Sequence, residues 1–364
     1  MHCNFTKYSM AFTDFPWPND PSFYYPHRDQ LKDYLLSYVQ HFDLLKFFKL
    51  SCRVDSAIQL DDLKWKISWT DLVKNEKHEH VFDYLIVASG LLSKPNIPNV
   101  RNKEDFQGIV KHSNDYKKND EIYKDKRVLV VGSSNSSVEI ASDLVGHAKS
   151  VINLFRRPFW VIPKFVKRKS VNNEDFYVPR DFLFYTRKFA YSNEAKYEKY
   201  SEICPLQVDK NSCPPDLYIA PSYKLPVNFG ISEHYLRLVT ENKIETKRGE
   251  MQNFISNGIQ LEDGSIVEAD VILYCTGYRL EIPYFNQDLL DKLDYDKENF
   301  KNPTILYKHT FHPSLSNLAF IFMSRGLFFI GLELQSKWTA SVFSGQIQFK
   351  QYNFALHFLI NLFL

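Results

Sequence analysis

The sequence predicts an α/β fold with a parallel, helix-covered sheet, divided into about two domains. The main observation is a strand–helix–strand pattern over residues 127–155, because a βαβ unit implies a parallel sheet. Two further apolar runs, 84–88 and 270–274, are typical of buried strands. The length of 364 residues exceeds the usual size of one domain, and 44% hydrophobic with 24% charged residues excludes a disordered chain.

The first quarter of the chain is expected to pass from loop to helix to antiparallel strands. Prolines crowd residues 16–26 and predict an irregular opening segment. Apolar residues recur every three or four positions over 28–42, which predicts a helix. Short alternating runs over 51–80 indicate a β-meander, and the apolar strand 84–88 follows it.

The middle of the chain carries the most regular pattern. Residues 127–131 (RVLVV) are an apolar run, 132–137 are small turn residues, and 138–145 are helical up to a closing Gly146. Residues 151–155 form a second apolar run. This order predicts two parallel strands joined by a helix.

The rest of the chain is less regular. Residues 165–225 are rich in charge, Tyr and Pro, so we expect an irregular, partly helical insertion. Asn-Gly at 257–258 and Asp-Gly at 263–264 are hairpin signals before the apolar strand 270–274. Residues 354–364 are apolar but shorter than the roughly 20 residues that span a bilayer. We expect a core element or a truncated end there, with a membrane tail as the alternative.

Charge and cysteine usage exclude several classes of protein. The 45 basic and 43 acidic side chains give a net charge of +2, so the bulk charge indicates neither nucleic acid nor an anionic membrane as partner. The five cysteines form no C-x-x-C pair, which predicts no disulfide framework and no metal site and favours a reducing, cytoplasmic location. Residues 1–20 contain no apolar signal-peptide core.

The turn after the strand 127–131 is a candidate phosphate site. Free N–H groups and the positive end of a helix dipole meet where a strand runs through a small-residue turn into a helix. The dinucleotide fingerprint is G-x-G-x-x-G, and only its first glycine is retained here. A generic βα turn is therefore the alternative. The candidate cofactor-binding residues are Gly132, Ser134, Asn135, Ser136 and Ser137.

An arginine pair at the end of the second strand favours NADP over NAD. An NAD site usually carries Asp or Glu about 20 residues after the first glycine, where it binds the ribose 2′-hydroxyl. This chain has Arg156 and Arg157 in that region, and a guanidinium suits a phosphate. The alternative is an ordinary solvated arginine pair, and the position at the strand end favours a binding role for at least Arg156.

A motif just upstream carries a family resemblance. Phe106, Gly108, His112 and Tyr116 have the spacing F-x-G-x-x-x-H-x-x-x-Y. This resembles the identifying motif of the class B flavin-containing monooxygenases. Related Baeyer–Villiger enzymes usually end the motif in Trp-Pro, so Tyr116 followed by Lys117 is more similar to the N- and S-oxygenating branch.

Other segments match the family in the same order along the chain. Asn4 to Lys7 resembles an Asn-x-x-Lys segment, and residues 84–90 and 274–278 resemble the two strand ends with A-T-G-type motifs. Residues 333–338 resemble a late helix of the fold. The resemblance covers nearly the whole chain and is weakest over 165–225.

The resemblance implies two doubly wound, Rossmann-like dinucleotide-binding domains, with an NADP domain inserted into a split FAD domain. The FAD domain would consist of residues 1–122 and 286–364, and the NADP domain of residues 123–285. In the family, NADPH reduces FAD, and the reduced flavin takes O2 to give a C4a-hydroperoxide. Its oxygen passes to a soft nucleophile such as an amine nitrogen or a thioether sulfur. No metal or nucleic acid is implied, and the oligomeric state is left open.

The family match also implies roles for single residues. The asparagine matched by Asn4 lies beside the flavin and helps to hold the hydroperoxide, which makes Asn4 the candidate catalytic side chain. Thr276, Gly277 and Gln335 are candidate cofactor-binding residues on the same basis. A frayed terminus is the alternative for Asn4, and a buried structural histidine is the alternative for His112.

The chain departs from the family at the flavin site. The family's FAD fingerprint, a G-x-G-x-x-G turn, stands upstream of the segment matched by Asn4, and no G-x-G occurs anywhere in this chain. Phe322 stands where a family glycine close to the flavin is expected. We therefore expect an N-terminally truncated FAD domain without its first βα unit, and poor FAD binding by the chain as given.

Three functions stay open at this point. The first is an NADPH- and FAD-dependent monooxygenase of the N,N-dimethylaniline type, in the broad class EC 1.14.13. The second is a non-oxygenating fragment that retains at most an NADP-binding module. The third, a Baeyer–Villiger or disulfide-reductase relative, is disfavoured by Tyr116 and by the lack of C-x-x-C.

Overall fold

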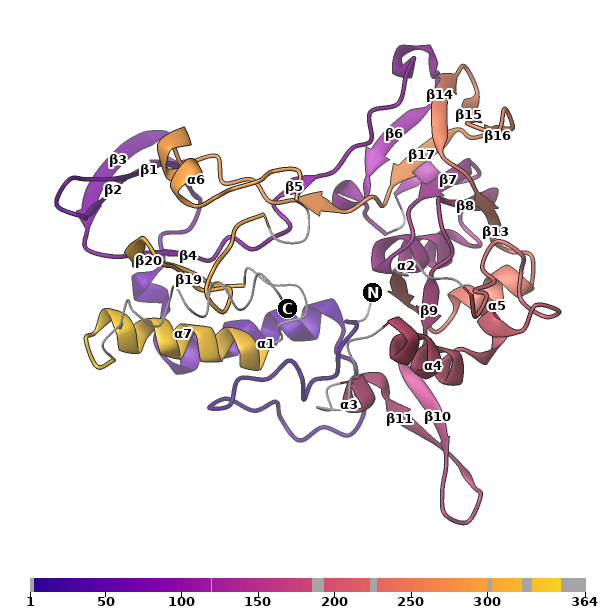
Figure 1. The fold of residues 1–364 in the computed structure, drawn as a ribbon, viewed down its shortest axis with the longest axis horizontal. Helices are drawn as coiled ribbons and strands as arrows, with labels where there is room; N and C mark the ends of the chain where they lie inside the picture. The colour runs from indigo at the N-terminus through magenta and orange to yellow at the C-terminus, as the bar shows by residue number, and fades with distance from the viewer. Residues whose placement is uncertain are drawn as a thin grey trace. The chain divides into compact units, whose positions relative to one another are not determined.

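A computed structural model gives the fold and describes residues 3–118, 120–184, 193–222, 228–299, 303–322 and 329–347. The chain forms two compact units. Unit 1 consists of Met1–Lys94 and Tyr278–Leu364, and unit 2 consists of Pro95–Gly277. Figure 1 shows the path of the chain from indigo at the N-terminus to yellow near the C-terminus. Unit 2 is thus inserted between two segments of unit 1.

Unit 1 opens with an irregular segment followed by helix α1 (Arg28–His41), as the sequence predicts. His27 and Gln30 form a capping box at the start of the helix. Tyr34 is the buried side chain of α1, and its hydroxyl accepts a hydrogen bond from the Phe12 N–H at 2.8 Å. Further helices of the unit are η1 (Leu45–Phe47), α6 (Gln287–Lys292) and α7 (Phe329–Phe343).

Two small sheets complete unit 1. The predicted meander is confirmed as the antiparallel sheet β1–β2–β3, and a second sheet has the order β19–β20–β4 with β20 parallel to β4. The two-residue strands β5 and β18 pair with each other at the two points where the chain passes between units. The bounds are β1 (Cys52–Gln59), β2 (Trp65–Asp71), β3 (Glu76–Phe82), β4 (Leu85–Val87), β5 (Lys94–Pro95), β18 (Tyr278–Arg279), β19 (Phe311–His312) and β20 (Leu315–Phe320).

The main core of unit 1 combines side chains from the meander, α6 and β20. Trp65 of β2 is fully buried, and its indole Nε1 donates to the Asn317 carbonyl oxygen of β20 at 3.2 Å. Leu289 of α6 and Leu318 of β20 are buried in the same cluster. The apolar contacts therefore join segments that lie on either side of unit 2 in the sequence.

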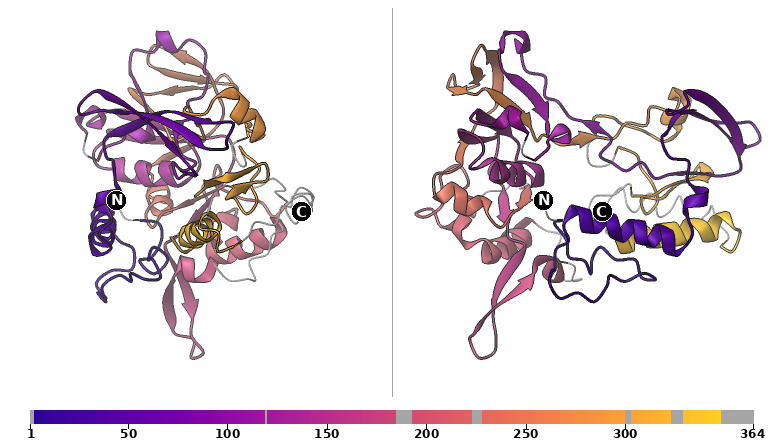
Figure 2. Two further views of the ribbon diagram at one scale, coloured as in Figure 1. Left: turned by 90° about the vertical axis from the view of Figure 1, so that its left-hand side faces the viewer. Right: turned by 180° about the vertical axis from the view of Figure 1, so that it is seen from behind.

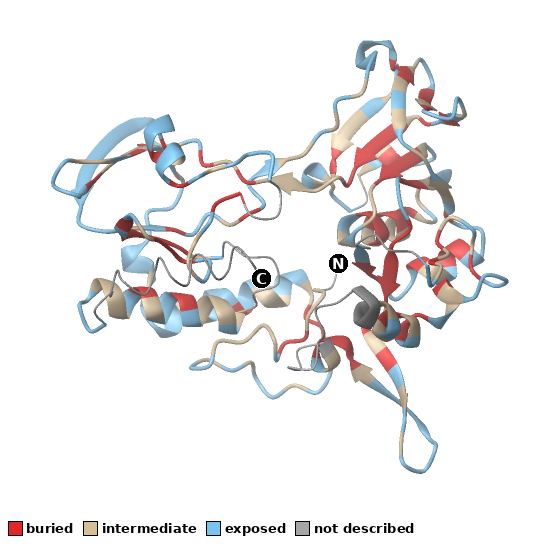
Figure 3. Cartoon of the chain, in the orientation of Figure 1, coloured by how far each residue is buried: buried red, intermediate tan, exposed pale blue. Residues whose placement is uncertain are grey.

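Unit 2 is built on a five-stranded parallel sheet with the order β13–β8–β7–β17–β6. Its strands are β6 (Ile109–His112), β7 (Arg127–Val131), β8 (Ser150–Phe155), β13 (Glu245–Arg248) and β17 (Val271–Tyr274). The central strands are almost entirely buried, as the red segments of Figure 3 show. In such open sheets, ligands bind outside the carboxyl ends of the strands, where the strand order reverses.

Helices and smaller sheets surround this parallel sheet. Two helices share a buried cluster with the sheet, namely α2 (Asn135–Leu144), which joins β7 to β8, and α5 (Tyr235–Thr240), which precedes β13. A parallel pair, β9 (Trp160–Ile162) and β12 (Phe229–Ile231), and an antiparallel sheet, β14 (Met251–Ile255), β15 (Gly258–Leu261) and β16 (Ile266–Glu268), are also present. Further helices of the unit are η2 (Lys103–Asp105), η3 (Ser113–Asp115), η4 (Glu121–Tyr123), η5 (Pro205–Val208), α3 (Arg180–Phe184) and α4 (Asn193–Ile203).

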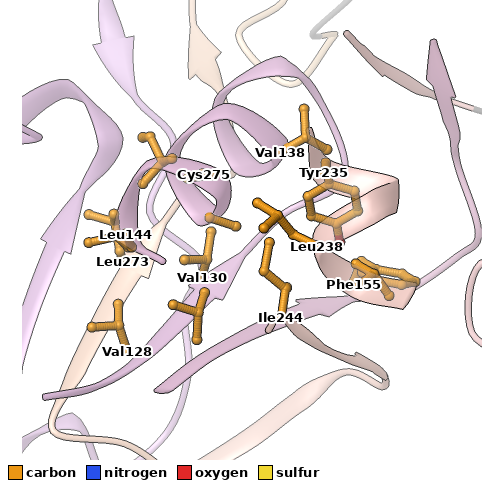
Figure 4. Close-up of a cluster of buried hydrophobic side chains, with 14 of the residues drawn as sticks. Val128, Val130, Val138, Leu144, Phe155, Tyr235, Leu238, Ile244, Leu273 and Cys275 are labelled. Atoms are coloured by element: carbon orange, nitrogen blue, oxygen red, sulfur yellow. The ribbon is translucent and has the colours of Figure 1, made fainter. Parts of the chain in front are cut away.

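Apolar side chains bind α2 and α5 to the sheet. Figure 4 shows Val130 of β7, Leu273 of β17, Val138 of α2 and Leu238 of α5 in one buried cluster. Each of them is less than 10% exposed. This packing fixes the helix that begins at the candidate phosphate turn.

The structure divides the chain at 94/95 and 277/278, whereas the expected boundaries were 122/123 and 285/286. Residues 95–122 belong to unit 2 because β6 is the edge strand of its sheet, with Ile109 opposite Val271. Residues 278–285 belong to unit 1, where the Ala57 N–H donates to the Tyr284 carbonyl oxygen at 2.8 Å.

The insertion at 165–225 is partly helical, as predicted, but it also holds an unpredicted β-hairpin. Strands β10 (Phe165–Lys169) and β11 (Asp175–Pro179) pair antiparallel and project from the rest of unit 2 (Figures 1 and 2). The turn places Asn173 at φ +64°, without the Asn-Gly or Asp-Gly signal of a tight hairpin. The apolar stretch 354–364 lies outside the described residues.

Candidate nucleotide-binding site

The candidate phosphate turn is a tight strand-to-helix connection, as predicted. β7 ends at Val131, and α2 begins at Asn135. Gly132 has φ +151°, and a Cβ at this position would lie 2.3 Å from the Cys275 carbonyl oxygen. Only glycine fits there, because any side chain would collide with the main chain of the neighbouring strand end.

A buried network that the sequence did not reveal holds this turn. The Gly132 N–H donates to the Leu154 carbonyl oxygen at 2.9 Å. Asn153 of β8 is fully buried, and its Nδ2 donates to the carbonyl oxygens of Val130 at 2.9 Å and Gly132 at 3.0 Å. The Tyr235 hydroxyl of α5 donates to Asn153 Oδ1 at 2.5 Å. The carbonyl side of the turn is therefore fixed by β8 and α5.

The small residues of the turn differ in their contacts: Ser137 and Asn135 bond main-chain groups, whereas Ser136 is exposed. Ser137 is buried, and its Oγ accepts from the Ser134 N–H at 3.0 Å and donates to the Ser134 carbonyl oxygen at 2.7 Å. Asn135 Oδ1 accepts from the Ile231 N–H of β12 at 3.0 Å. Ser136 is exposed on the first turn of α2, where the N–H groups of a helix have no intrahelical acceptor. The main-chain donors of Asn135 and Ser136 are therefore the natural contacts for an anion.

The arginine pair lies at the carboxyl edge of the same sheet. Arg156 and Arg157 directly follow β8, and both are exposed. The structure adds Arg248, which ends the neighbouring strand β13 and pairs in register with Phe155. Arg156 Nη1 lies 3.4 Å from Glu250 Oε1. Sequence reasoning missed Arg248 and Glu250, because only the pairing of β13 with β8 brings them to this edge.

The first half of the family motif fills the core beside β17. Phe106 is buried and packs against Phe254, with ring centroids 5.7 Å apart. A Cβ on Gly108 would lie 2.3 Å from the Asp270 carbonyl oxygen, so the chain passes β17 too closely for a side chain. These two residues thus have packing roles in unit 2.

The second half of the motif makes polar contacts within unit 2. His112 is buried, its Nε2 lies 3.0 Å from the Gly277 carbonyl oxygen, and its Nδ1 accepts from the Asn114 N–H at 3.1 Å. Burial lowers the pKa of His112, although the contact with the Gly277 carbonyl opposes that shift. The Tyr116 hydroxyl donates to Asp143 Oδ2 of α2 at 2.8 Å. Burial, and then this carboxylate, raise the pKa of Tyr116 far above its usual range. These contacts agree with the structural alternative for His112.

Thr276 and Gly277 form a turn that is bonded to Asn96. Asn96 Nδ2 donates to the Thr276 carbonyl oxygen at 3.2 Å, and the Asn96 N–H donates to the Gly277 carbonyl oxygen at 2.9 Å. Gly277 has φ +82°, a conformation that favours glycine. Their contact with a cofactor stays a prediction.

In unit 1, Asn4 lies in an anchored segment. The Cys3 N–H donates to the Pro26 carbonyl oxygen and the Lys7 N–H to the Tyr24 carbonyl oxygen, both at 2.8 Å. Lys7 is buried, and its Nζ donates to the Asp20 carbonyl oxygen. The frayed-terminus alternative does not hold for this segment, while the catalytic role of Asn4 stays a prediction.

Gln335 ties helix α7 to its own unit. Its Oε1 accepts from the Phe322 N–H at 3.1 Å, and its Nε2 donates to Thr310 Oγ1 at 3.0 Å. Phe322 has φ +66°, and a Cβ on Gly90 would lie 3.6 Å from its ring. Phe322 therefore has a left-handed backbone conformation near the ends of β4 and β20. The family resemblance predicts a glycine at this position.

The described residues do not fit the pyrophosphate of FAD in unit 1. A pyrophosphate site needs a helix that begins directly at the carboxyl end of a parallel strand. Neither α1 nor α6 follows a strand of the β19–β20–β4 sheet, and residues 323–328 between β20 and α7 are outside the described ranges. The convergent main-chain donors of Asn135 and Ser136 belong to unit 2.

In the ranges given above, no group of three or more His, Cys, Asp or Glu side chains is arranged to hold a metal ion. None of the helices described combines the length and the apolar character that crossing a bilayer requires. Cys52, Cys204, Cys213 and Cys275 are free thiols.

Comparisons with known proteins agree with the motif. The model of the flavin-binding monooxygenase-like family matches residues 1–356. The chain is 29% identical over 359 residues to a 4-hydroxybenzoate brominase (decarboxylating) of Marinomonas mediterranea, covering 95% of this chain and 65% of that protein. It is 30% identical over 356 residues to the N-oxide-forming dimethylaniline monooxygenase 2 of Rattus norvegicus, covering 94% and 63%. The chain thus spans just under two thirds of the length of these relatives.

Solved structures with the same fold support the predicted architecture. The S-allyl-L-cysteine S-oxygenase of Allium sativum superposes with a TM-score of 0.66 at 20% identity, covering 99% of this chain and 66% of that chain. An open structure of cyclohexanone monooxygenase gives a TM-score of 0.68 at 16% identity, covering 95% and 79%. At these identities the likeness shows the fold alone, and it confirms the expected α/β, Rossmann-type architecture.

Proposed function

Because this chain belongs to the flavin-binding monooxygenase-like family, we propose that its unit 2 binds NADPH as the reductant of a flavin-dependent monooxygenase. The observation that carries the proposal is the turn after β7, where only glycine fits at position 132. The turn leads into α2 at the carboxyl edge of a parallel sheet, which is the usual place for a dinucleotide. Bound NADPH would supply a hydride for flavin reduction.

Specific residues of unit 2 would hold the nucleotide. The N–H groups of Asn135 and Ser136 would bind the pyrophosphate, with Gly132 allowing close approach of the main chain. Arg156, with Arg248 beside it, would bind the 2′-phosphate, because a guanidinium offers paired donors to phosphate oxygens. Asn153 would keep the turn in place through its bonds to the main chain.

For the whole protein we propose oxygenation of a soft nucleophile, an amine nitrogen or a thioether sulfur, with O2 as co-substrate. Tyr116 in the family motif supports this branch over Baeyer–Villiger chemistry, and the dimethylaniline monooxygenase among the relatives agrees with it. Asn4 would contact the flavin, and Thr276, Gly277 and Gln335 would support cofactor binding. The free thiols of Cys52, Cys204, Cys213 and Cys275 are compatible with a reducing, cytoplasmic location.

A second candidate function is an NADPH-binding module that does not oxygenate. Two observations favour this second function. The described part of unit 1 does not fit the FAD pyrophosphate, and the Phe322 ring lies close to Gly90.

Titration of the purified chain with FAD, followed by NADPH oxidation with dimethylaniline or a thioether, separates the two functions. Weak flavin binding with no substrate-dependent NADPH consumption is the outcome that the described part of unit 1 predicts, and it would show that this chain by itself acts as the non-oxygenating module. Stoichiometric flavin and consumption of NADPH that depends on the amine or thioether would establish the monooxygenase, and would require flavin donors outside the described residues.

A further inference from the structure

Glu250 faces the arginine that is proposed to read the 2′-phosphate. Its Oε1 lies 3.4 Å from Arg156 Nη1, and the side chains of Arg156 and Glu250 are 73% and 50% exposed. A surface pair of this length contributes little to stability, because solvent screens it. The main effect of the pair is on charge: a ligand at this edge of the sheet would meet the Glu250 carboxylate next to the Arg156 guanidinium.

The main chain places Glu250 at this edge. The Gly249 N–H donates to the Phe155 carbonyl oxygen at 3.1 Å, which continues the pairing of β13 with β8 (Figure 1). The Glu262 N–H donates to the Glu250 carbonyl oxygen at 3.0 Å. A Cβ on Gly249 would lie 2.6 Å from Leu261, so this passage is tightly packed. The Glu250 backbone is thereby held next to the strand end that bears Arg156.

We propose that Glu250 is a specificity-determining residue that reduces the preference of this site for NADP(H) over NAD(H). The inference rests on the proposed nucleotide site of unit 2. A carboxylate beside Arg156 neutralises part of the guanidinium charge and repels the 2′-phosphate dianion. The same carboxylate is a suitable acceptor for the 2′-hydroxyl of NAD(H), the group that an acidic residue usually binds in NAD sites.

The substitution Glu250→Gln tests the proposal, because it removes the charge and keeps the shape. We expect NADP+ to bind about tenfold more tightly, since one like-charge contact near the phosphate is lost. NAD+ should bind with unchanged or slightly lower affinity. The matched control is Glu241→Gln, which alters the net charge equally and removes an exposed Glu–Arg contact with Arg237 at 2.9 Å at the other end of β13.

Calorimetric titration of both nucleotides into the wild-type chain and the variants gives the ratio of their dissociation constants. In an Arg156→Ala background, Glu250→Gln should change the NADP+ affinity less than it does in the wild type. An unchanged NADP+/NAD+ ratio in Glu250→Gln, with NADP+ still bound by the wild type, would overturn this inference alone. Failure of the wild type to bind either nucleotide would overturn the proposed function.

Discussion

Gly132 is the residue on which the nucleotide turn depends most directly. Its backbone has φ +151°, and the Cys275 carbonyl oxygen occupies the space of a side chain at 2.3 Å. The neighbouring donor Asn153 bonds the Gly132 carbonyl oxygen from the other side at 3.0 Å. The position is therefore restricted both by conformation and by a rigid main-chain contact.

Gly132→Ala is expected to destabilise the chain by about 3 kcal/mol, because overpacking against a main-chain atom adds to backbone strain. Urea unfolding measures the loss. The control Gly264→Ala has a similarly unfavourable φ of +82° with no atom within 4 Å of the added Cβ, so it should cost only about 1–2 kcal/mol. Equal losses in the two variants would show that the contact with Cys275 is not restrictive.

Arg156→Ala is expected to weaken NADP+ binding by about tenfold or more, since a hydrogen bond to a charged group contributes roughly 1.5–3 kcal/mol. NAD+ lacks the 2′-phosphate and should bind almost as before. Titration calorimetry with both nucleotides measures the effect, and Arg157→Ala serves as the comparison for a neighbouring exposed arginine. Equal losses for NADP+ and NAD+ in Arg156→Ala would rule out a role in reading the 2′-phosphate.

The Glu333 carboxylate is one of the groups through which helix α7 contacts the N-terminal segment. Glu333 Oε2 accepts from the Thr13 N–H at 2.9 Å, and Oε1 accepts from Lys337 Nζ at 2.5 Å. Desolvation raises the pKa of Glu333, but the bonds from Lys337 and Thr13 outweigh it and lower the pKa from 4.5 to about 2. The ionised carboxylate is thus the form that stabilises the fold.

This contact predicts a pH dependence of the free energy of unfolding. Because the folded pKa lies below the unfolded value, the contribution is present above about pH 4.5 and is lost as the pH falls towards 2. Glu333→Gln should destabilise the chain at pH 7 by about 1 kcal/mol. It should also weaken the dependence of the free energy of unfolding on pH between about 2 and 4.5. Denaturant unfolding between pH 2 and 7 measures both effects, with Glu262→Gln as the control. If the free energy of unfolding of Glu333→Gln changes with pH in parallel with that of the wild type, Glu333 is not the source of this pH dependence.

Most elements near the site could be predicted because their signals are local. β7 spans the predicted residues 127–131, and α2 and β8 follow within a few residues of their expected positions, since the apolar runs and the glycine turn lie close together in the sequence. Asn153 and Tyr235 could not be predicted, because their bond joins residues 82 apart. Arg248 and Glu250 reach the site only through the pairing of β13 with β8. The β10–β11 hairpin was missed because its turn lacks a standard signal.

At the scale of the whole molecule, the two units differ in what they offer a dinucleotide. Unit 2 presents a parallel sheet, a glycine-restricted turn and a helix that begins at that turn. In the described part of unit 1, β20 pairs in parallel with β4, and neither α1 nor α6 directly follows one of these strands. The family resemblance predicted the division into two units, while the contacts of β6 determine where unit 2 begins.

This difference predicts that the purified chain binds FAD weakly. Side-chain cations could supply charge, but they would not replace the convergent main-chain N–H groups of a helix start. The visible absorbance of the protein after incubation with FAD and gel filtration measures retained flavin. We expect well under one flavin per chain, and a yellow protein with stoichiometric flavin would contradict the prediction.

Calorimetric titration of the purified chain with NADP+ and NAD+ is the decisive test of the NADP(H) site proposed for unit 2. We expect one NADP+ per chain, bound more tightly than NAD+, and loss of that preference in Arg156→Ala. Absence of NADP+ binding, or equal affinity for the two nucleotides in the wild type that Arg156→Ala leaves unchanged, would contradict it.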